Sequence, residues 1–339
     1  MSELRQDPTT NDWIIIATER AKRPKQFARP AERVPAPLPE HDPQCPFCPG
    51  NESWTPPEEW AYRTGRPNET GWWVRTIPNK FPALRPEGSL ERRMHNSLYR
   101  TMDGLGKHEV IIETPRHNAS LAFLPDEQVE EVVLMYRDRY LALREDPRFK
   151  YIIIFKNSGE RAGTSLAHPH SQLVATPIVP PYIRRKHEVA TQFYDNTGKC
   201  VYCEMRDEEL RIGLRVILET ERFVVIHPFA SRSPFETWIL PKVHHPSFGQ
   251  ISVPEAREFA RVLKNTLLRL HKVLNGPDYN FILHTIPVKD ENEEYYLWHL
   301  QIVPRIVRVA GFEMGSGIYI NTALPEETAA YMRDVKAEG

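Results

Sequence analysis

An internal repeat constrains the fold of this chain more than any other feature of its 339 residues. A Cys-x-x-Cys pair at residues 45–48 recurs at residues 200–203. In each half, strand-like runs, a proline-led helical pattern and two more strand-like runs follow the pair. The Glu-to-His spacing of residues 109–117 is repeated in residues 236–244, so the two halves align in one register. Each half therefore predicts a β-β-helix-β-β unit of the α+β class, with a largely antiparallel sheet and flanking helices.

The overall composition excludes several classes of protein. The formal net charge is −1, which gives no general attraction to nucleic acid or to an anionic membrane. No apolar run reaches transmembrane length and the polar first residues do not form a secretory signal, so we expect a cytoplasmic protein. Four cysteines arranged as two Cys-x-x-Cys pairs, without a secretory signal, indicate metal ligands rather than disulfides.

Three polar side chains share one face of a predicted strand. Strand side chains alternate, so His168, His170 and Gln172 point the same way, and Pro169 requires the strand to lie at an edge or to begin there. The preceding loop, residues 157–165, is polar and contains glycines, and such loops present backbone N–H groups to anions. A pair of structural histidines in a turn is the alternative. Three aligned polar groups beside such a loop favour a catalytic site.

These residues carry a family resemblance. The motif His168-Pro-His170-Ser-Gln172 resembles the active-site signature of the galactose-1-phosphate uridylyltransferase branch of the histidine-triad superfamily. Matching segments run from Arg5 to about Glu326, and include Trp13 with Arg20-Ala-Lys-Arg23-Pro, Cys45-Pro-Phe-Cys48-Pro-Gly-Asn, Pro78-Asn-Lys-Phe-Pro, and Pro234-Phe-Glu-Thr-Trp-Ile-Leu-Pro-Lys-Val-His244. The resemblance implies tandem histidine-triad-like repeats in one shared sheet, with the zinc site and catalytic histidine in residues 1–178 and the second repeat in residues 179–339. It also implies a homodimer that binds a nucleotide sugar and a hexose 1-phosphate.

His170 is the expected nucleophile. A neutral imidazole can attack an α-phosphorus and form a covalent nucleotidyl–histidine, provided that a backbone carbonyl holds its other nitrogen. The resemblance assigns this covalent role to His170. Gln172 would hydrogen-bond a phosphate oxygen of the adduct, and its amide cannot titrate as a proton donor for hydrolysis. The adduct then waits for a second phosphate, which favours a transferase over a hydrolase.

The cysteines and histidines predict two metal sites. The first set has two cysteines and two histidines, the ligands of a tetrahedral zinc site: Cys45, Cys48, His117 and His168. Four protein ligands leave no open coordination position, so we expect a structural metal. It would fix His168 and thereby orient the nearby His170. The repeat supplies a second set, for which His299 is the preferred fourth ligand because Leu297 occupies the position equivalent to His168. That set is Cys200, Cys203, His244 and His299, with His284, His245 or a water as alternatives to His299.

The remaining site residues are implied by the resemblance alone. Residues matching phosphate contacts are Asn157, Gly163, Thr164 and Ser165, of which we group Ser165 with the catalytic His170 and Gln172. Nucleotide contacts match Asn79 and Lys80, a basic pair that reaches the neighbouring subunit's nucleotide sugar matches Arg20 and Arg23, and sugar contacts match Phe312 and Glu313. Solvated surface arginines are the alternative for Arg20 and Arg23. Val307-Arg308 departs from the Lys-Phe of the best-known relatives.

The leading hypothesis is a uridylyltransferase that converts UDP-glucose and galactose 1-phosphate into glucose 1-phosphate and UDP-galactose, by a ping-pong route through His170. Residues 311–321 and the Cys200–Cys203 pair also resemble the ADP-glucose phosphorylase branch, so adenylyl transfer to phosphate is an alternative. A catalytically silent nucleotide-binding zinc protein is a second alternative. A zinc-finger nucleic-acid binder is disfavoured, because the metal ligands are scattered along a nearly neutral chain.

Overall fold

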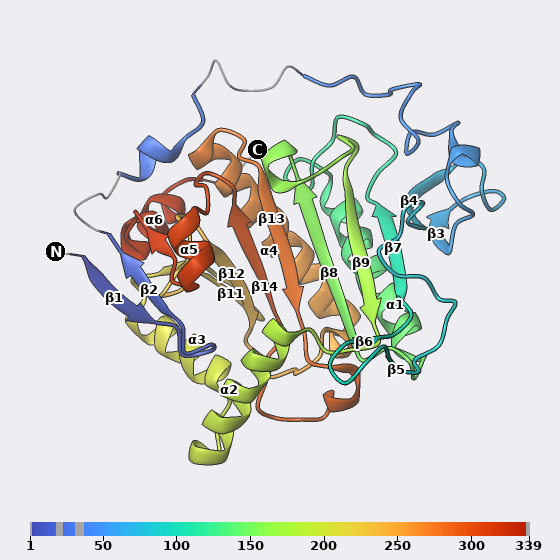
Figure 1. Ribbon diagram of the computed structural model, residues 1–339. Coiled ribbons are helices and arrows are strands. Elements are labelled where there is room, and N and C mark those ends of the chain that lie inside the picture. Colours follow the sequence, from blue (N-terminus) through green and yellow to red (C-terminus); the bar gives the residue numbers. More distant parts are fainter. Residues whose placement is uncertain (1, 18–22, 31–36, 337–339) are drawn as a thin grey trace.

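The computed structural model describes residues 2–17, 23–30 and 37–336 (Figure 1). In this part of the chain the main sheet has ten strands, in the order β10-β11-β12-β14-β13-β8-β9-β7-β4-β3, and every neighbouring pair is antiparallel. Its strands are β3 (Trp60–Arg63), β4 (Trp72–Pro78), β7 (Lys107–Ile112), β8 (Tyr151–Ser158), β9 (His170–Thr176), β10 (Val216–Glu219), β11 (Phe223–Ile226), β12 (Thr237–Pro241), β13 (Tyr279–His284) and β14 (His299–Pro304).

The repeat is visible in the strand order. The centre of the sheet is the β8–β13 pair, in which Lys156 lies opposite Phe281. Outward from this pair, β9, β7, β4 and β3 on one side correspond to β14, β12, β11 and β10 on the other. The predicted α+β class and the shared antiparallel sheet are therefore confirmed, whereas the division at residue 178 stays a prediction.

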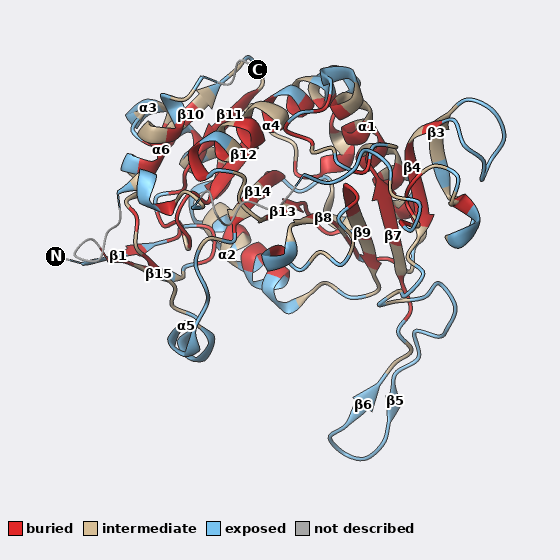
Figure 2. Ribbon diagram, turned by 90° about the horizontal axis from the view of Figure 1, so that it is seen from above, coloured by how far each residue is buried: buried red, intermediate tan, exposed pale blue. Residues whose placement is uncertain are grey.

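Two long helices cover one face of this sheet (Figure 2). Helices α1 (Asp126–Arg144) and α4 (Val253–Leu274) are the two predicted proline-led helices, and they pack against each other and against the sheet. The side chain of Ser252 caps α4 by accepting a hydrogen bond from the backbone N–H of Glu255, which satisfies a donor at the helix start. The buried apolar side chains of both helices join the largest hydrophobic core, which extends across both halves of the sheet.

Besides α1 and α4, the described residues form four shorter α-helices, namely α2 (Pro181–Thr197), α3 (Val201–Ile212), α5 (Gly311–Ser316) and α6 (Pro325–Arg333). Two small sheets lie apart from the main one: β1 (Glu3–Gln6), β2 (Trp13–Ile16) and β15 (Ile320–Asn321) form one, and the hairpin of β5 (Arg93–Met94) and β6 (Arg100–Thr101) forms the other. The hairpin projects from the body of the molecule in Figure 2. No helix among the described residues is long and apolar enough to cross a membrane.

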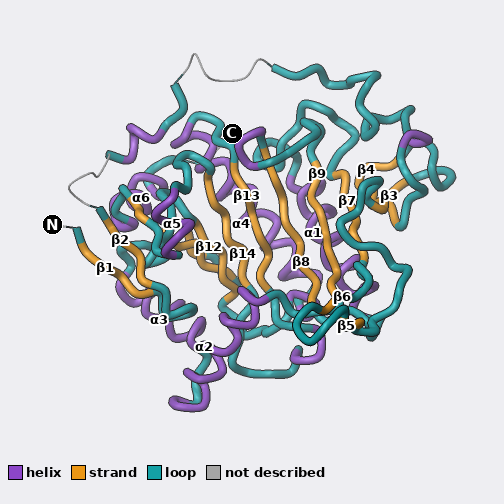
Figure 3. Tube along the Cα trace, in the orientation of Figure 1, coloured by secondary structure: helices purple, strands orange, loops and turns teal. Residues whose placement is uncertain are grey.

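The proline-containing segment before the sheet is loop-rich, as its composition predicts. Residues 37–59 run mostly as loop over the end of the molecule that carries β3 and β4, interrupted by the short 3-10 helix Glu52–Trp54 (Figure 3). This segment carries Cys45 and Cys48. The second pair is built differently, because Cys200 precedes α3 and Cys203 lies in its first turn, so these two cysteines come from a helix start.

Candidate active site

Strand β9 lies in the interior of the sheet, between β7 and β8. It begins at His170 because the preceding Pro169 has no N–H to donate to a neighbouring strand. Its Nδ1 lies 2.8 Å from the backbone carbonyl oxygen of His168. A carbonyl only accepts, so Nδ1 carries the proton and Nε2 keeps its lone pair. Burial lowers the pKa of His170 below its usual value, and the charge of Lys156 lowers it further. A buried, neutral imidazole with a fixed tautomer is what nucleophilic attack on phosphorus requires.

Gln172 is oriented by a histidine that the sequence analysis missed. The ring of His108 accepts a hydrogen bond at Nδ1 from the backbone N–H of Ala83 (3.1 Å), so its Nε2–H is the donor to Oε1 of Gln172 (2.8 Å). With the oxygen of Gln172 engaged, its NH₂ group keeps its donors for another acceptor. This orientation suits the predicted contact with a phosphate oxygen.

A cavity of about 480 Å³, on the side of the site where phosphate binding is predicted, reaches His170. The predicted residues Asn157, Thr164 and Ser165 line it, together with Lys156, whereas Gly163 is not among its lining residues. The loop turns at Gly159 and Gly163, whose φ values of 89° and 87° favour glycine. The lining of this cavity therefore brings most of the predicted cradle next to the nucleophile.

An adjoining cavity of about 600 Å³ shares Ser165, Leu166 and His170 with the first and contains Gln172. Its walls are mostly aromatic and apolar, and in addition to these residues it is lined by Pro46, Phe47, Trp54, Thr55, Pro56, Ile77, Asn79, Lys80, Phe81 and Val110. The predicted Asn79 and Lys80 thus lie beside Gln172. Aromatic walls next to a nucleophile provide stacking surfaces for a nucleobase.

The first predicted metal set comes together as a buried cluster. The ligand atoms of Cys45, Cys48, His117 and His168 all lie within 4.8 Å of one another. Nδ1 of His168 is 3.7 Å from Sγ of Cys45 and 3.6 Å from Sγ of Cys48. Tetrahedral zinc separates sulfur and nitrogen ligands by about 3.6 Å. Nε2–H of His168 donates to the carbonyl of Thr114 (2.8 Å), which leaves Nδ1 for the metal.

The second predicted set comes together only in part. Cys200, Cys203 and His244 form a cluster, with Nδ1 of His244 3.2 Å from Sγ of Cys203, but His299 lies outside it. On β14, His299 occupies the position that His170 occupies on β9, and its Nδ1 donates to the carbonyl of Leu297 (3.0 Å). Its ring stacks on Trp238 and His284 at centroid distances of 4.6 and 4.8 Å. His299 therefore does not complete this cluster in the structure, because it lies two residues beyond Leu297, at the position equivalent to His170, and its ring packs on Trp238 and His284.

The comparisons with known proteins agree with this geometry. Residues 1–180 match the family model described as the N-terminal domain of galactose-1-phosphate uridyl transferase. The chain belongs to the galactose-1-phosphate uridylyltransferase family. It is 38% identical over 336 residues to the ADP-glucose phosphorylase of Arabidopsis thaliana, covering 98% of this chain and 93% of that protein. It is 30% identical over 346 residues to the galactose-1-phosphate uridylyltransferase of Thermotoga maritima, covering 100% of both.

A solved structure supports the same assignment. The crystal structure of A. thaliana ADP-glucose phosphorylase with bound ADP-glucose matches with a TM-score of 0.83, at 34% identity, and covers 99% of both chains. The protein is thus a member of a nucleotidyltransferase family, and its chain follows the family fold from end to end.

Several residues that the uridylyltransferase resemblance assigns lie away from His170. Arg20 falls outside the described residues, and the exposed Arg23 precedes a short 3-10 helix and lines neither cavity at His170. Phe312 and Glu313 lie on α5, and Glu313 lines a separate cavity of about 400 Å³ with Arg308. The contribution of Arg20 and Arg23 to the site of a neighbouring subunit, and of Phe312 and Glu313 to sugar binding, remains a prediction.

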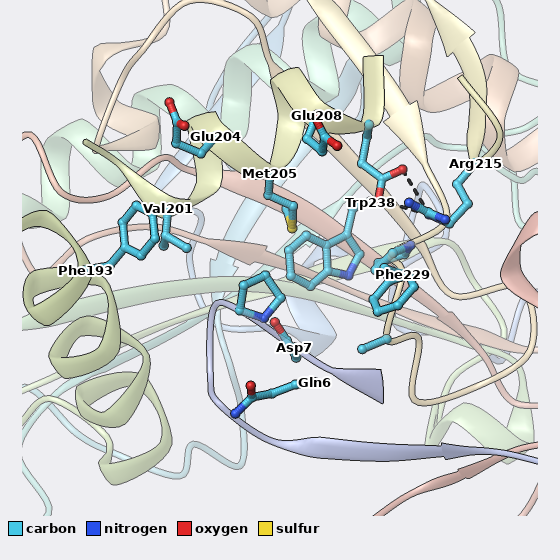
Figure 4. Close-up of a pocket in the computed structure, with 14 residues that line it drawn as sticks. Gln6, Asp7, Phe193, Val201, Glu204, Met205, Glu208, Arg215, Phe229 and Trp238 are labelled. Atoms are coloured by element: carbon cyan, nitrogen blue, oxygen red, sulfur yellow. Dashed lines mark hydrogen bonds and ion pairs between the residues drawn. The ribbon is translucent and has the colours of Figure 1, made fainter. Parts of the chain in front are cut away.

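A further cavity, of about 300 Å³, lies between the loop after β1, helices α2 and α3, and Trp238 of β12 (Figure 4). Its walls are largely apolar, and Glu209 on one side is paired with Arg215 at 3.0 Å. None of its lining residues carries an imidazole, thiol, hydroxyl or amine. This cavity offers carboxylates but no imidazole like that of His170, and the cavities at His170 are the candidate active site.

Proposed function

We propose that the protein transfers a nucleotidyl group from a nucleotide sugar through a covalent adduct on His170, with ADP-glucose as donor and inorganic phosphate as acceptor. The observation that carries the chemistry is the hydrogen bond from Nδ1 of His170 to the carbonyl of His168, which leaves Nε2 unprotonated at a cavity lined by phosphate-binding groups.

The reaction has two balanced steps. In the first, Nε2 of His170 attacks the α-phosphorus, an N–P bond forms, and the bond from this phosphorus to the bridging oxygen breaks, releasing glucose 1-phosphate. In the second, an oxygen of inorganic phosphate attacks the same phosphorus, the N–P bond breaks, and ADP leaves with His170 restored. The NH₂ group of Gln172 donates to a nonbridging oxygen in both transition states, where negative charge accumulates.

The choice of adenine rests on the relatives and the size of the base cavity. The match to an ADP-glucose phosphorylase is 38% identical over 98% of the chain, against 30% for the T. maritima uridylyltransferase. The cavity of about 600 Å³ offers Trp54, Phe47 and Phe81 as aromatic walls, and a two-ring base gains more contact from such walls than a pyrimidine. Uridylyl transfer from UDP-glucose to galactose 1-phosphate is the second candidate, favoured by the full-length T. maritima match.

We further propose that the cluster of Cys45, Cys48, His117 and His168 holds a structural zinc. Four protein ligands close the coordination sphere, so the metal would supply rigidity rather than a Lewis acid for the substrate. The metal would affect the reaction indirectly, by fixing His168, whose carbonyl holds the ring of His170. The cluster of Cys200, Cys203 and His244 offers three soft or borderline ligands and is proposed as a second zinc site of lower occupancy.

The test is a substrate panel with radiolabelled nucleotide. ADP-glucose and UDP-glucose labelled in the nucleotide are each incubated with the protein, and label on His170 is located by peptide mapping. Turnover is then measured with inorganic phosphate and with galactose 1-phosphate. Adenylyl label, with ADP formed from phosphate, supports the proposal, and uridylyl label with UDP-galactose formation supports the second candidate. His170→Ala should lose all label, whereas His245→Ala, at a histidine paired with Glu255 outside both cavities, should retain it.

The homodimer expectation has its own test. If Glu313 serves the site of a neighbouring subunit, the single variants His170→Ala and Glu313→Ala should both be inactive, and mixing the two unfolded chains before refolding should restore part of the activity. Restored activity requires a dimer with one intact composite site. No recovery, in chains that refold and form a dimer, would assign Glu313 to its own subunit or to no site.

A further inference from the structure

A buried ion pair lies directly behind the nucleophile, and the reaction described above does not use it. Nζ of Lys156 donates to Oε2 of Glu113 at 2.7 Å and to the backbone carbonyl of His170 at 2.9 Å. Glu113 is fully buried and Lys156 is 4% exposed. Buried charges of this kind are costly to desolvate, so a pair that also touches the backbone of the nucleophile calls for a functional explanation.

The carboxylate of Glu113 is held in one orientation by three donors. Its Oε1 accepts from Oγ of Ser171 at 2.5 Å and from the hydroxyl of Tyr136 at 3.2 Å, while Oε2 accepts from Lys156. Burial raises the pKa of Tyr136 well above its usual range, so this phenol stays neutral. Ser171 follows His170 directly in β9, and Lys156 comes from β8, so both strands that build the site are tied to one carboxylate.

The charges of Lys156 and Glu113 cancel, but only one of the two residues reaches the cavity at His170. Lys156 lines the cavity of about 480 Å³ with His170, Asn157 and Thr164, whereas Glu113 does not line it. The positive end of the pair is therefore the end at the phosphate side. An ammonium has three donors, and the two contacts within the described part of the chain leave one for a group in the cavity.

We propose that Lys156, held by Glu113, is a positioning residue for His170 that also places a fixed positive charge beside the reacting phosphate. This proposal depends on the nucleotidyl transfer proposed above. The ammonium holds the carbonyl of His170 and thereby the start of β9, as the carbonyl of His168 holds the ring. A positive charge that is already in position in a largely desolvated site stabilises the transition state of phosphoryl transfer more than the ground state, because negative charge accumulates in the transition state.

A second buried ion pair provides a matched control. Arg139 of α1 binds Glu109 of β7 through two hydrogen bonds, of 2.9 and 2.7 Å, and both residues are buried. Neither residue lines a cavity at His170. If buried ion pairs near the centre of the sheet serve stability alone, changes at the two pairs should have the same kinetic consequence.

The test compares charge-removing double variants, because a single change would leave one buried charge unpaired and could prevent folding. Glu113→Gln/Lys156→Met and Glu109→Gln/Arg139→Met are measured for melting temperature, for the single-turnover rate of labelling at His170, and for kcat and KM. We expect the first double variant to lose labelling rate and kcat by about 10²-fold, with a smaller change in KM, and the second to stay within about threefold of wild type. Lys156→Arg, which keeps the charge, should recover at least about tenfold of the loss.

The outcomes distinguish failure of the proposed nucleotidyl transfer from failure of the role proposed for Lys156. If wild-type protein acquires no label from either nucleotide sugar, the proposed function fails and this inference fails with it. If wild type is labelled and the folded Glu113→Gln/Lys156→Met protein is labelled at the same rate, only the role of Lys156 is overturned. An equal loss of rate in both double variants also overturns it, because the effect would then follow from sheet stability. If the double variant does not fold, Glu113→Gln/Lys156→Gln, which removes both charges but keeps polar groups that can pair, decides by the same rate measurement, and an unchanged rate overturns the role.

Discussion

The backbone carbonyl of His168 lies 2.8 Å from Nδ1 of His170, so one residue joins the metal cluster to the nucleophile. The ring of His168 belongs to the cluster, and its carbonyl fixes the tautomer of His170. Loss of the metal would therefore change the position of the nucleophile without removing any group that touches substrate. If zinc occupies this cluster as proposed, it is coupled to the proposed nucleophile through the backbone of one residue.

Loss of a ligand from the first proposed metal site should slow the labelling of His170, whereas loss of a ligand from the second should not. We expect Cys48→Ser to lower the zinc content measured by mass spectrometry by about one ion per chain and to reduce the rate of His170 labelling by about 10²-fold. Cys203→Ser is the matched control, because its cluster contains no residue that contacts His170. A Cys48→Ser protein that has lost zinc but is labelled at the wild-type rate would contradict the coupling.

The orientation of Gln172 should depend on His108. In His108→Phe the donor to Oε1 of Gln172 is lost, so the amide can rotate and present its oxygen to the phosphate. We expect kcat to fall about tenfold, and we expect the melting temperature to fall modestly, because Phe also removes the acceptor for the N–H of Ala83 and each such hydrogen bond contributes about 1 kcal/mol. His108→Gln, which can donate from a similar position, should retain more of the activity. Equal kcat values for the two variants would show that the amide is held by another contact.

The sequence predicted the sheet and the two long helices, because these depend on local patterns, whereas most of the proposed site residues were assigned by the family resemblance. Period-two and period-3.6 spacing do not require long-range contacts, and the alternation through His168, His170 and Gln172 fixes their common face. In the repeat, His299 lies two residues after Leu297, the counterpart of His168, and in the structure it takes the place of His170 and does not join the second cluster. Following the repeat strictly would have left that cluster with three ligands.

What could not be predicted depends on contacts between distant segments. Glu113 and Lys156 read as ordinary charged residues in sequence, and only the pairing of β7, β9 and β8 brings them together under His170. Helix α2 was missed because its buried face includes Lys186 and His187, residue types that apolar periodicity counts as exposed. His108 likewise gave no sequence signal, since its role depends on Gln172, which lies on the neighbouring strand.

Trp54 should contribute to binding of the base and not to the chemical step. Its side chain is 46% exposed and lines the cavity that contains Gln172 and His170. Trp54→Ala should raise KM for the nucleotide sugar by about 5- to 10-fold, equivalent to loss of one aromatic contact of about 1 kcal/mol, and leave kcat unchanged. The increase should be larger for ADP-glucose than for UDP-glucose. Trp60→Ala, at a tryptophan that is 53% exposed on β3 but lines neither cavity, is the control and should leave both constants at the wild-type values.

The stability of the protein should fall as the pH falls below 6.5, because buried neutral histidines resist protonation. Burial lowers the pKa of His227 to about 3, and burial followed by the charge of Lys186 lowers the pKa of His187 to about 3. Between pH 6.5 and these values the unfolded chain binds a proton at each position that the folded chain does not. Each histidine then removes about 1.4 kcal/mol of unfolding free energy per pH unit.

This dependence is measured by urea unfolding at pH 6.5 and pH 5. We expect the free energy of unfolding of wild type to fall, with His187 and His227 each accounting for about 2 kcal/mol of the loss. In His227→Gln the loss over this interval should be smaller by about 2 kcal/mol, and in the double variant with His187→Gln it should be smaller by about twice as much. Comparing variants with wild type over the same interval cancels the acid release of metal, which is common to all three proteins. A His227→Gln protein with the wild-type pH dependence would show that this ring is already protonated in the folded state, or that it is not buried as described.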